Sequence, residues 1–125
     1  MAATLRTRTP MLVVFLDLDG YKVACEERAD LEVAEMIDDY YDRVATAVQT
    51  AGGRVVKFIG DASLVIFSER ALDAGVSMLC DLVPRVDSFM RERGWKCRLR
   101  AKAHFGDVIA GEFGSTGVAR FDVLG

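Results

Sequence analysis

The order in which strand-like and helix-like patterns follow one another limits the possible folds of this chain most. An apolar run over 11–18, rich in β-branched residues, predicts a buried strand. Apolar residues then recur at spacings of three and four from Val33 to Ala51, which predicts a helix. We expect Asp30 to be its N-cap and Gly52-Gly53 to end it, since glycine accepts the left-handed conformation found at helix ends.

The middle of the chain adds a hairpin and a second helix. Two short strands, 54–58 and 63–67, are predicted to pair through a turn with Gly60 at its tip. A second apolar stripe predicts a helix over 70–93. Pro84 lies inside this helix and is expected to kink or interrupt it, because the proline ring removes a backbone donor.

The last third of the chain is strand-like. Strict alternation over 98–104 predicts a strand with one buried face. Residues 108–113 are expected to pair back with it through a Gly106-Asp107 turn, and a further strand to begin at 120–124. The whole order predicts an α+β fold, a ferredoxin-like βαββαβ core with two helices on one side of a mostly antiparallel sheet.

Length and composition limit the classes of protein further. The 125 residues provide for one domain, which we divide into a lead-in over 1–10 and a domain over 11–125 that is incomplete at its C-terminus. A net charge of −3 argues against a nucleic-acid partner, and no apolar run is long enough for a membrane segment. Three widely spaced cysteines, without a C-x-x-C pair, indicate reduced thiols and a cytoplasmic location.

Two acidic residues occupy positions where a carboxylate is costly. Asp17 interrupts the first apolar strand near its end, and Asp61 follows Gly60 at the hairpin tip. Either one alone is as often a turn or capping residue. If the first strand neighbours the hairpin, however, both carboxylates can converge on one hard cation, because Mg²⁺ prefers oxygen ligands together with substrate phosphates.

Four segments resemble, in order, the motifs of the class III nucleotide cyclases. They are FLDLDGY at 15–21, KFIGDA at 57–62, AHFGDVIAG at 103–111 and FDVLG at 121–125. Any one of these motifs alone is weak. Together they span nearly the whole chain in the family's order, which makes the resemblance specific.

The resemblance implies an adenylate cyclase that converts ATP to 3′,5′-cyclic AMP and pyrophosphate. Asp17 and Asp61 would hold two divalent cations, Mg²⁺ or Mn²⁺, about 3.5–4 Å apart. The ribose 3′-hydroxyl would attack the α-phosphorus in line. The phosphates would lie near Gly60 and near the backbone of the segment after Asp17, which comprises Leu18, Asp19, Gly20 and Tyr21.

By the same resemblance, Lys57 and Asp122 would contact the purine base. Lysine only donates hydrogen bonds and an ionised aspartate only accepts them, so the pair suits N1 and N6 of adenine. Guanine would place its N1–H against the ammonium and its O6 against the carboxylate. Each unpaired buried polar group costs roughly 1–3 kcal/mol, so ATP should be favoured over GTP by about tenfold or more.

The resemblance further implies a head-to-tail homodimer with shared active sites. The metal-binding Asp17 and Asp61 of one subunit would face Lys57 and Asp122 of the other. The family's transition-state asparagine and arginine lie on a helix after the segment of Asp122. The sequence ends before such a helix, so we expect the 125-residue fragment alone to be inactive or nearly so.

Two other functions remain open. A catalytically inactive cyclase-like domain that binds nucleotide or dimerises would keep the same motifs. A phosphatase of the haloacid-dehalogenase type would use Asp17 as nucleophile and Asp19 as acid–base. The phosphatase lacks support, because no threonine follows the D-L-D-G, Val65 stands where a second carboxylate is expected, and the 44 residues between its motifs are too few for an alternating parallel sheet.

The basic residues of the alternating strand are a further candidate site. Arg98, Arg100 and Lys102 share one face, as an RNA-binding sheet would require. That face carries no interleaved aromatic residues for base stacking, so we interpret it as a solvated or subunit-facing strip. His104, the single histidine, is predicted to be structural.

Overall fold

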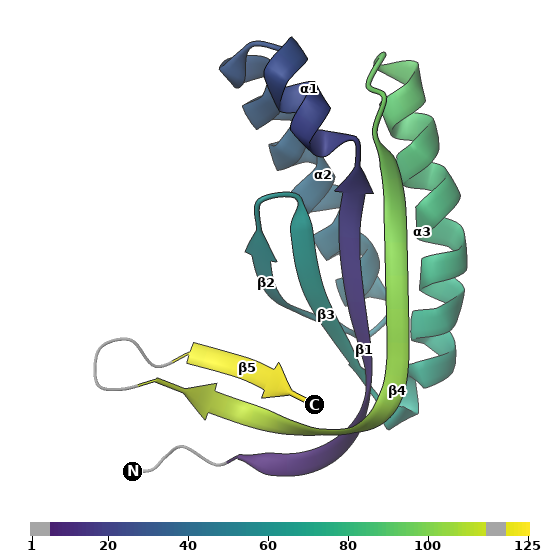
Figure 1. The fold of residues 1–125 in the computed structure, drawn as a ribbon. Helices are drawn as coiled ribbons and strands as arrows, with labels where there is room; N and C mark the ends of the chain where they lie inside the picture. The colour runs from purple at the N-terminus through teal and green to yellow at the C-terminus, as the bar shows by residue number, and fades with distance from the viewer. Residues whose placement is uncertain (1–5, 115–119) are drawn as a thin grey trace.

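The computed structural model describes residues 6–114 and 120–125. Figure 1 shows the elements in their chain order. They are β1 (Thr7–Asp19), α1 (Tyr21–Glu27), α2 (Asp30–Thr50), β2 (Arg54–Ile59), β3 (Ala62–Ser68), the single 3-10 turn η1 (Glu69–Ala71), α3 (Leu72–Glu92), β4 (Arg98–Phe113) and β5 (Arg120–Leu124).

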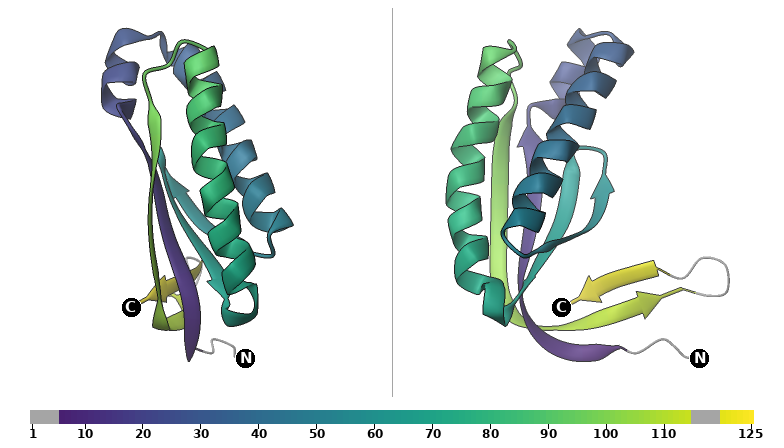
Figure 2. Two further views of the ribbon diagram at one scale, coloured as in Figure 1. Left: turned by 90° about the vertical axis from the view of Figure 1, so that its right-hand side faces the viewer. Right: turned by 180° about the vertical axis from the view of Figure 1, so that it is seen from behind.

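The strands form one sheet in the order β2-β3-β1-β4-β5, and each neighbouring pair is antiparallel. Helices α2 and α3 lie side by side on one face of the sheet (Figure 2). This confirms the predicted α+β, ferredoxin-like arrangement, in which each crossover helix places the next strand beyond an intervening neighbour. It also excludes the haloacid-dehalogenase alternative, because that fold requires a parallel sheet.

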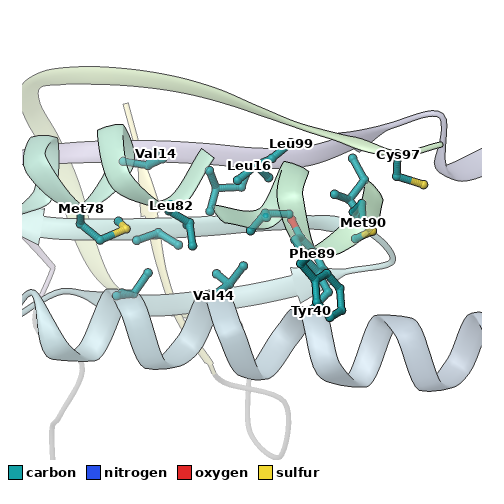
Figure 3. Packing of buried hydrophobic residues seen from close by; sticks show 14 of the residues in the cluster. Val14, Leu16, Tyr40, Val44, Met78, Leu82, Phe89, Met90, Cys97 and Leu99 are labelled. Atoms are coloured by element: carbon teal, nitrogen blue, oxygen red, sulfur yellow. The ribbon is translucent and has the colours of Figure 1, made fainter. Parts of the chain in front are cut away.

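The main core lies between the sheet and the two long helices. On β1 every second residue from Leu12 to Leu18 is buried, and these side chains meet apolar residues of α2 and α3 (Figure 3). Burying one such side chain contributes about 1.5–3 kcal/mol. A one-residue slip of β1 would move Asp17 and Asp19 into this core, so the register of the central strand is strongly specified.

The ends of the first long helix differ in part from the prediction. Helix α2 begins at Asp30, but Ala29 is its N-cap, and the Glu32 carboxylate accepts a hydrogen bond from the Ala29 N–H at 3.3 Å. The prediction that Asp30 caps the helix is therefore wrong. The predicted end of helix α2 at Gly52-Gly53 is confirmed, and Gly52 has a φ of +87°. The short helix α1 was not predicted.

The second long helix runs without interruption through Pro84. An internal proline costs one backbone hydrogen bond and crowds the preceding turn. Leu82 and Val86, buried on either side of Pro84, hold the helix against the sheet and offset that cost. No described helix is both long enough and apolar enough to cross a membrane.

The predicted turn at Gly106-Asp107 is wrong, because β4 continues unbroken from Arg98 to Phe113. The reason lies in β1, which begins at Thr7 rather than Met11 and pairs its first residues with the second half of β4, Thr7 with Ala110 and Pro10 with Asp107. A strand that finds a partner along its whole length stays extended. The division into a lead-in over 1–10 and a domain over 11–125 stays a prediction.

The face of the sheet opposite to α2 and α3 is called here the open face. At its lower end the outer parts of β1 and β4 bend away together with β5 (Figure 1), and a second apolar cluster fills the bend. Its buried members are Val13, Leu64, Ile66, Val108, Ala110 and Val123.

The first part of β4 is a sheet edge, because β5 pairs with β4 over Ile109–Phe113. Ala101 and Ala103 are exposed there, contrary to the predicted buried face.

Candidate active site

Asp17 and Asp61 lie on neighbouring segments at one end of the sheet. Leu16 and Leu18 are buried against the helices, so Asp17 between them points to the open face. Asp61 lies in the turn between β2 and β3, and its Oδ2 accepts a hydrogen bond from the Leu18 N–H at 2.9 Å. The expectation that the first strand neighbours the hairpin is confirmed, since β1 pairs with β3.

Two consecutive tyrosines of α2 hold the hairpin tip that carries Asp61. The Tyr40 hydroxyl donates a long hydrogen bond of 3.4 Å to the Asp61 carbonyl, and the Tyr41 hydroxyl donates to the Gly60 carbonyl. The Tyr41 ring also stacks on Phe58 at 4.0 Å between centroids. The apolar stripe from Val33 to Ala51 includes Tyr40 but does not indicate this contact, although a buried tyrosine usually finds a partner for its hydroxyl.

The electrostatics of Tyr40 link the two carboxylates. The pKa of the Tyr40 phenol is raised mainly by burial, and the charges of Asp61 and Asp17 raise it further. The charges of both aspartates therefore act on the same hydroxyl. Their predicted role as metal ligands stays a prediction.

Arg100 contacts Asp17 directly. Its Nε lies 2.9 Å from Asp17 Oδ1 and its Nη2 lies 3.3 Å from Oδ2, while Nη1 is 3.6 Å from Asp19 Oδ1. The hydrogen bond and charge of Asp17 raise the pKa of the Arg100 guanidinium. The sequence pattern placed Arg100 in a solvated or subunit-facing strip, because alternation gives the face of a residue but not its cross-strand partner.

The donor atoms at this end of the sheet fit a divalent cation. Two carboxylates offer hard oxygen ligands, and Mg²⁺ commonly takes one or two carboxylates and fills its other positions with water and substrate phosphates. Within 6–114 and 120–125, no group of three or more His, Cys, Asp or Glu side chains could form a complete protein cage.

The segment after Asp17 turns sharply into α1. Gly20 has a φ of +90°, and a Cβ at this position would lie 2.6 Å from the Lys96 carbonyl oxygen. Only glycine fits here, both for its backbone conformation and for the close approach of the neighbouring segment. The next residue, Tyr21, is partly enclosed, and this burial together with a hydrogen bond to Cys25 raises its pKa to about 12.

A second polar pair spans the open face from β2 to β5. Lys57 Nζ lies 2.8 Å from Asp122 Oδ2, and the Val123 N–H donates to Asp122 Oδ1 at 2.8 Å. The hydrogen bond from Lys57 is the main reason why the pKa of Asp122 lies below its usual value. Nearby, the Arg54 guanidinium covers the Phe121 ring at 3.7 Å.

The structure thus forms two separate sets of polar residues. Asp17 and Asp61 lie near the C-terminal end of β1. Lys57 and Asp122 lie between the outer strands β2 and β5. Among the described residues, no hydrogen bond or ion pair joins one set to the other. Lys57 and Asp122 contact each other directly, whereas Asp61 reaches the segment of Asp17 through the Leu18 N–H.

Comparisons with known proteins point to one family. The family profile of the adenylate and guanylate cyclase catalytic domain matches residues 5–125. An adenylate cyclase of Anabaena cylindrica is 26% identical over 123 residues, which cover 92% of this chain and 24% of the relative. The receptor-type guanylate cyclase gcy-23 of Caenorhabditis elegans is 28% identical over 112 residues, covering 83% of this chain and 10% of the relative.

Solved structures show the same fold. The adenylyl cyclase CyaB of P. aeruginosa superimposes with a TM-score of 0.89 over 97% of this chain and 68% of that one, at 21% sequence identity. The chain spans about a quarter or less of the length of the two curated relatives described above. At this identity the structural likeness establishes the fold, and the relatives include proteins named for either nucleotide.

Proposed function

The chain belongs to the family of adenylate and guanylate cyclase catalytic domains, and on that premise we propose that it is the catalytic domain of an adenylate cyclase. It converts ATP to 3′,5′-cyclic AMP and pyrophosphate. The observation that carries the choice of ATP is the ion pair between Lys57 and Asp122, with 2.8 Å between Nζ and Oδ2.

This pair matches the hydrogen-bonding edge of adenine. The ammonium of Lys57 can donate to N1, and the carboxylate of Asp122 can accept from the N6 amino group. The lowered pKa of Asp122 keeps it ionised, and therefore an acceptor only, at neutral pH. Guanine would present a donor to Lys57 and an acceptor to Asp122, which leaves buried polar groups unpaired.

Asp17 and Asp61 would hold the metal, either Mg²⁺ or Mn²⁺. Two such ions, when bound, polarise the phosphates and lower the pKa of the ribose 3′-hydroxyl that attacks the α-phosphorus. Leu18 positions Asp61 through its backbone N–H, and Tyr40 and Tyr41 hold the hairpin that carries Asp61. Gly20 lets the backbone of 18–21 approach the phosphates closely.

We further propose a head-to-tail homodimer in which each active site combines both subunits. The two polar sets of one chain are separate, so a single chain presents the metal ligands and the purine contacts at different places. On the open face Phe15 is 58% exposed and Ile59 is 65% exposed, and large apolar side chains of this kind are suited to burial against a second copy. The free thiols of three cysteines support the proposed cytoplasmic location.

The proposal is tested by assaying the full-length protein with ATP and GTP in separate reactions, each with Mn²⁺ or Mg²⁺. Cyclic AMP should form at least about tenfold faster than cyclic GMP, because two buried polar groups are mismatched with guanine. An Asp17→Asn variant should lose both activities, and an exposed control in η1, Arg70→Ala, should keep them. Binding of ATP without turnover would favour the catalytically inactive alternative, and faster formation of cyclic GMP would contradict the substrate assignment.

A further inference from the structure

Arg100 occupies the oxygens that a metal would need. The guanidinium of Arg100 contacts both carboxylate oxygens of Asp17, at 2.9 and 3.3 Å, and its third nitrogen lies 3.6 Å from Asp19 Oδ1. A planar guanidinium matches a carboxylate in this two-point geometry better than any other side chain. The contact therefore competes for the same oxygen atoms as a divalent cation.

The fold itself imposes this contact. Asp17 and Arg100 are directly opposite in the pairing of β1 with β4, and both point to the open face. The adjacent pair in the register, Leu18 and Leu99, is buried on the helix side, at 3% and 5% exposure. A slip of the register would expose these leucines, so the packing of the core holds Arg100 beside Asp17.

The charges around Asp17 indicate how the contact with Arg100 affects the binding of a divalent cation. Asp17, Asp19 and Asp61 bring three carboxylates to this end of the sheet, and Arg100 cancels one of those negative charges. A free divalent cation must displace the guanidinium from Asp17 and then remain close to it, which weakens its binding. A triphosphate carries negative charge of its own, so a cation that arrives with nucleotide compensates the displaced guanidinium.

We propose that Arg100 is a positioning residue that occupies Asp17 until nucleotide is present, so that divalent metal enters together with the nucleotide rather than alone. This inference rests on the proposed function, because it assigns a role at the same site. Arg100 sets the order of binding through Asp17 and takes no part in the bond changes of the reaction.

The test is a titration of the full-length protein with Mn²⁺ alone, with free Mn²⁺ followed by its electron paramagnetic resonance signal at low ionic strength. In Arg100→Ala the dissociation constant for Mn²⁺ should fall roughly three- to tenfold, because one nearby positive charge is removed. Arg100→Lys, which keeps the charge but loses the two-point contact, should give a dissociation constant between those of wild type and Arg100→Ala. With a non-hydrolysable ATP analogue in excess, the difference between wild type and Arg100→Ala should shrink.

Two controls locate the effect. Lys102→Ala removes a positive charge two residues along the same face of β4, opposite Phe15, and should change the Mn²⁺ dissociation constant less than about twofold. Adding Asp17→Asn to Arg100→Ala should abolish the gain. Equal Mn²⁺ affinity in wild type and Arg100→Ala, an equal gain in Lys102→Ala, or a gain that survives Asp17→Asn would each overturn the inference.

Failure of this inference can be told apart from failure of the proposed function. If the wild type makes cyclic AMP but Arg100→Ala does not bind Mn²⁺ more tightly, the inference fails and the cyclase assignment stands. If Arg100→Ala binds Mn²⁺ more tightly through Asp17 but no cyclic nucleotide forms, the inference stands and the assignment fails. Thermal melting of each variant shows whether the fold is retained.

Discussion

At the scale of single residues, Asp61 makes a structural contact that can be separated from its proposed metal-binding role. One oxygen of its carboxylate accepts the Leu18 N–H, which holds the hairpin tip against the end of β1. Its negative charge, together with that of Asp17, is what a divalent cation would require. An asparagine at this position keeps an acceptor for the N–H but loses the charge, whereas an alanine loses both.

We therefore predict different outcomes for Asp61→Ala and Asp61→Asn. Asp61→Ala should lower the free energy of unfolding by about 1–3 kcal/mol, because the Leu18 N–H is left without its partner. Asp61→Asn should recover most of this stability while cyclase activity stays at least about a hundredfold below wild type. Urea unfolding and a cyclic AMP assay on the same preparations check both outcomes, and an active Asp61→Asn variant would refute the metal-ligand role.

The two glycines beside this site illustrate how differently one residue type is used. At Gly20 both the backbone conformation and the nearby Lys96 carbonyl exclude a side chain. Gly60 also has a positive φ, of +59°, but nothing lies within 4 Å of where its Cβ would be. The turn at Gly20 is therefore constrained by both backbone conformation and packing, and the hairpin tip at Gly60 by backbone conformation alone.

At the scale of elements, the contact between β2 and β5 depends on the Lys57–Asp122 ion pair. In the folded chain the pKa of Asp122 lies below the ordinary value of 3.8, mainly because of the hydrogen bond from Lys57. The unfolded chain thus binds a proton at Asp122 more readily than the folded chain. The pair contributes its full stability above pH 3.8, and that contribution is lost as the pH falls through the lower, folded-state value.

This gives a prediction for Lys57→Met. Near neutral pH the variant should be less stable than wild type by less than about 1 kcal/mol, since the pair is partly exposed to solvent. The difference should shrink as the pH falls below the ordinary carboxyl value and Asp122 becomes protonated. Urea unfolding at a series of pH values measures it, with Lys102→Met as the matched control. A difference that does not change with pH would mean that the ion pair is not its source.

At the scale of the whole molecule, the separation of the two polar sets leads to a test of shared active sites. On the proposed function, Lys57→Ala would remove a purine contact and Asp17→Ala a metal ligand, so each variant alone should be inactive. When equal amounts are mixed, half of the dimers carry one damaged chain of each kind and one intact site, which should restore about a quarter of wild-type activity. Cyclic AMP production after mixing measures this, and no recovery would contradict a site built from two chains.

How much the sequence determined is clearest for the helices and the short hairpin. Helix α2 and the β2–β3 hairpin appear where local periodicity predicted them, because the spacing of hydrophobic residues indicates which side chains each element buries. The motifs around Asp17, Asp61, Lys57 and Asp122 also led to the correct family. Locally encoded features of this kind need no knowledge of distant contacts.

Only the tertiary structure decided which individual residues meet across elements. Gly106-Asp107 looks like a turn, but it stays extended because the start of β1, about a hundred residues away in the sequence, pairs with it. Arg100 looks like a solvated charge, but the strand register places it on Asp17. The Tyr41 hydroxyl likewise finds the Gly60 carbonyl only after α2 has packed beside the hairpin. Cross-strand pairing and contacts between a helix and a turn join residues that are far apart in the sequence. A local sequence pattern does not contain this information.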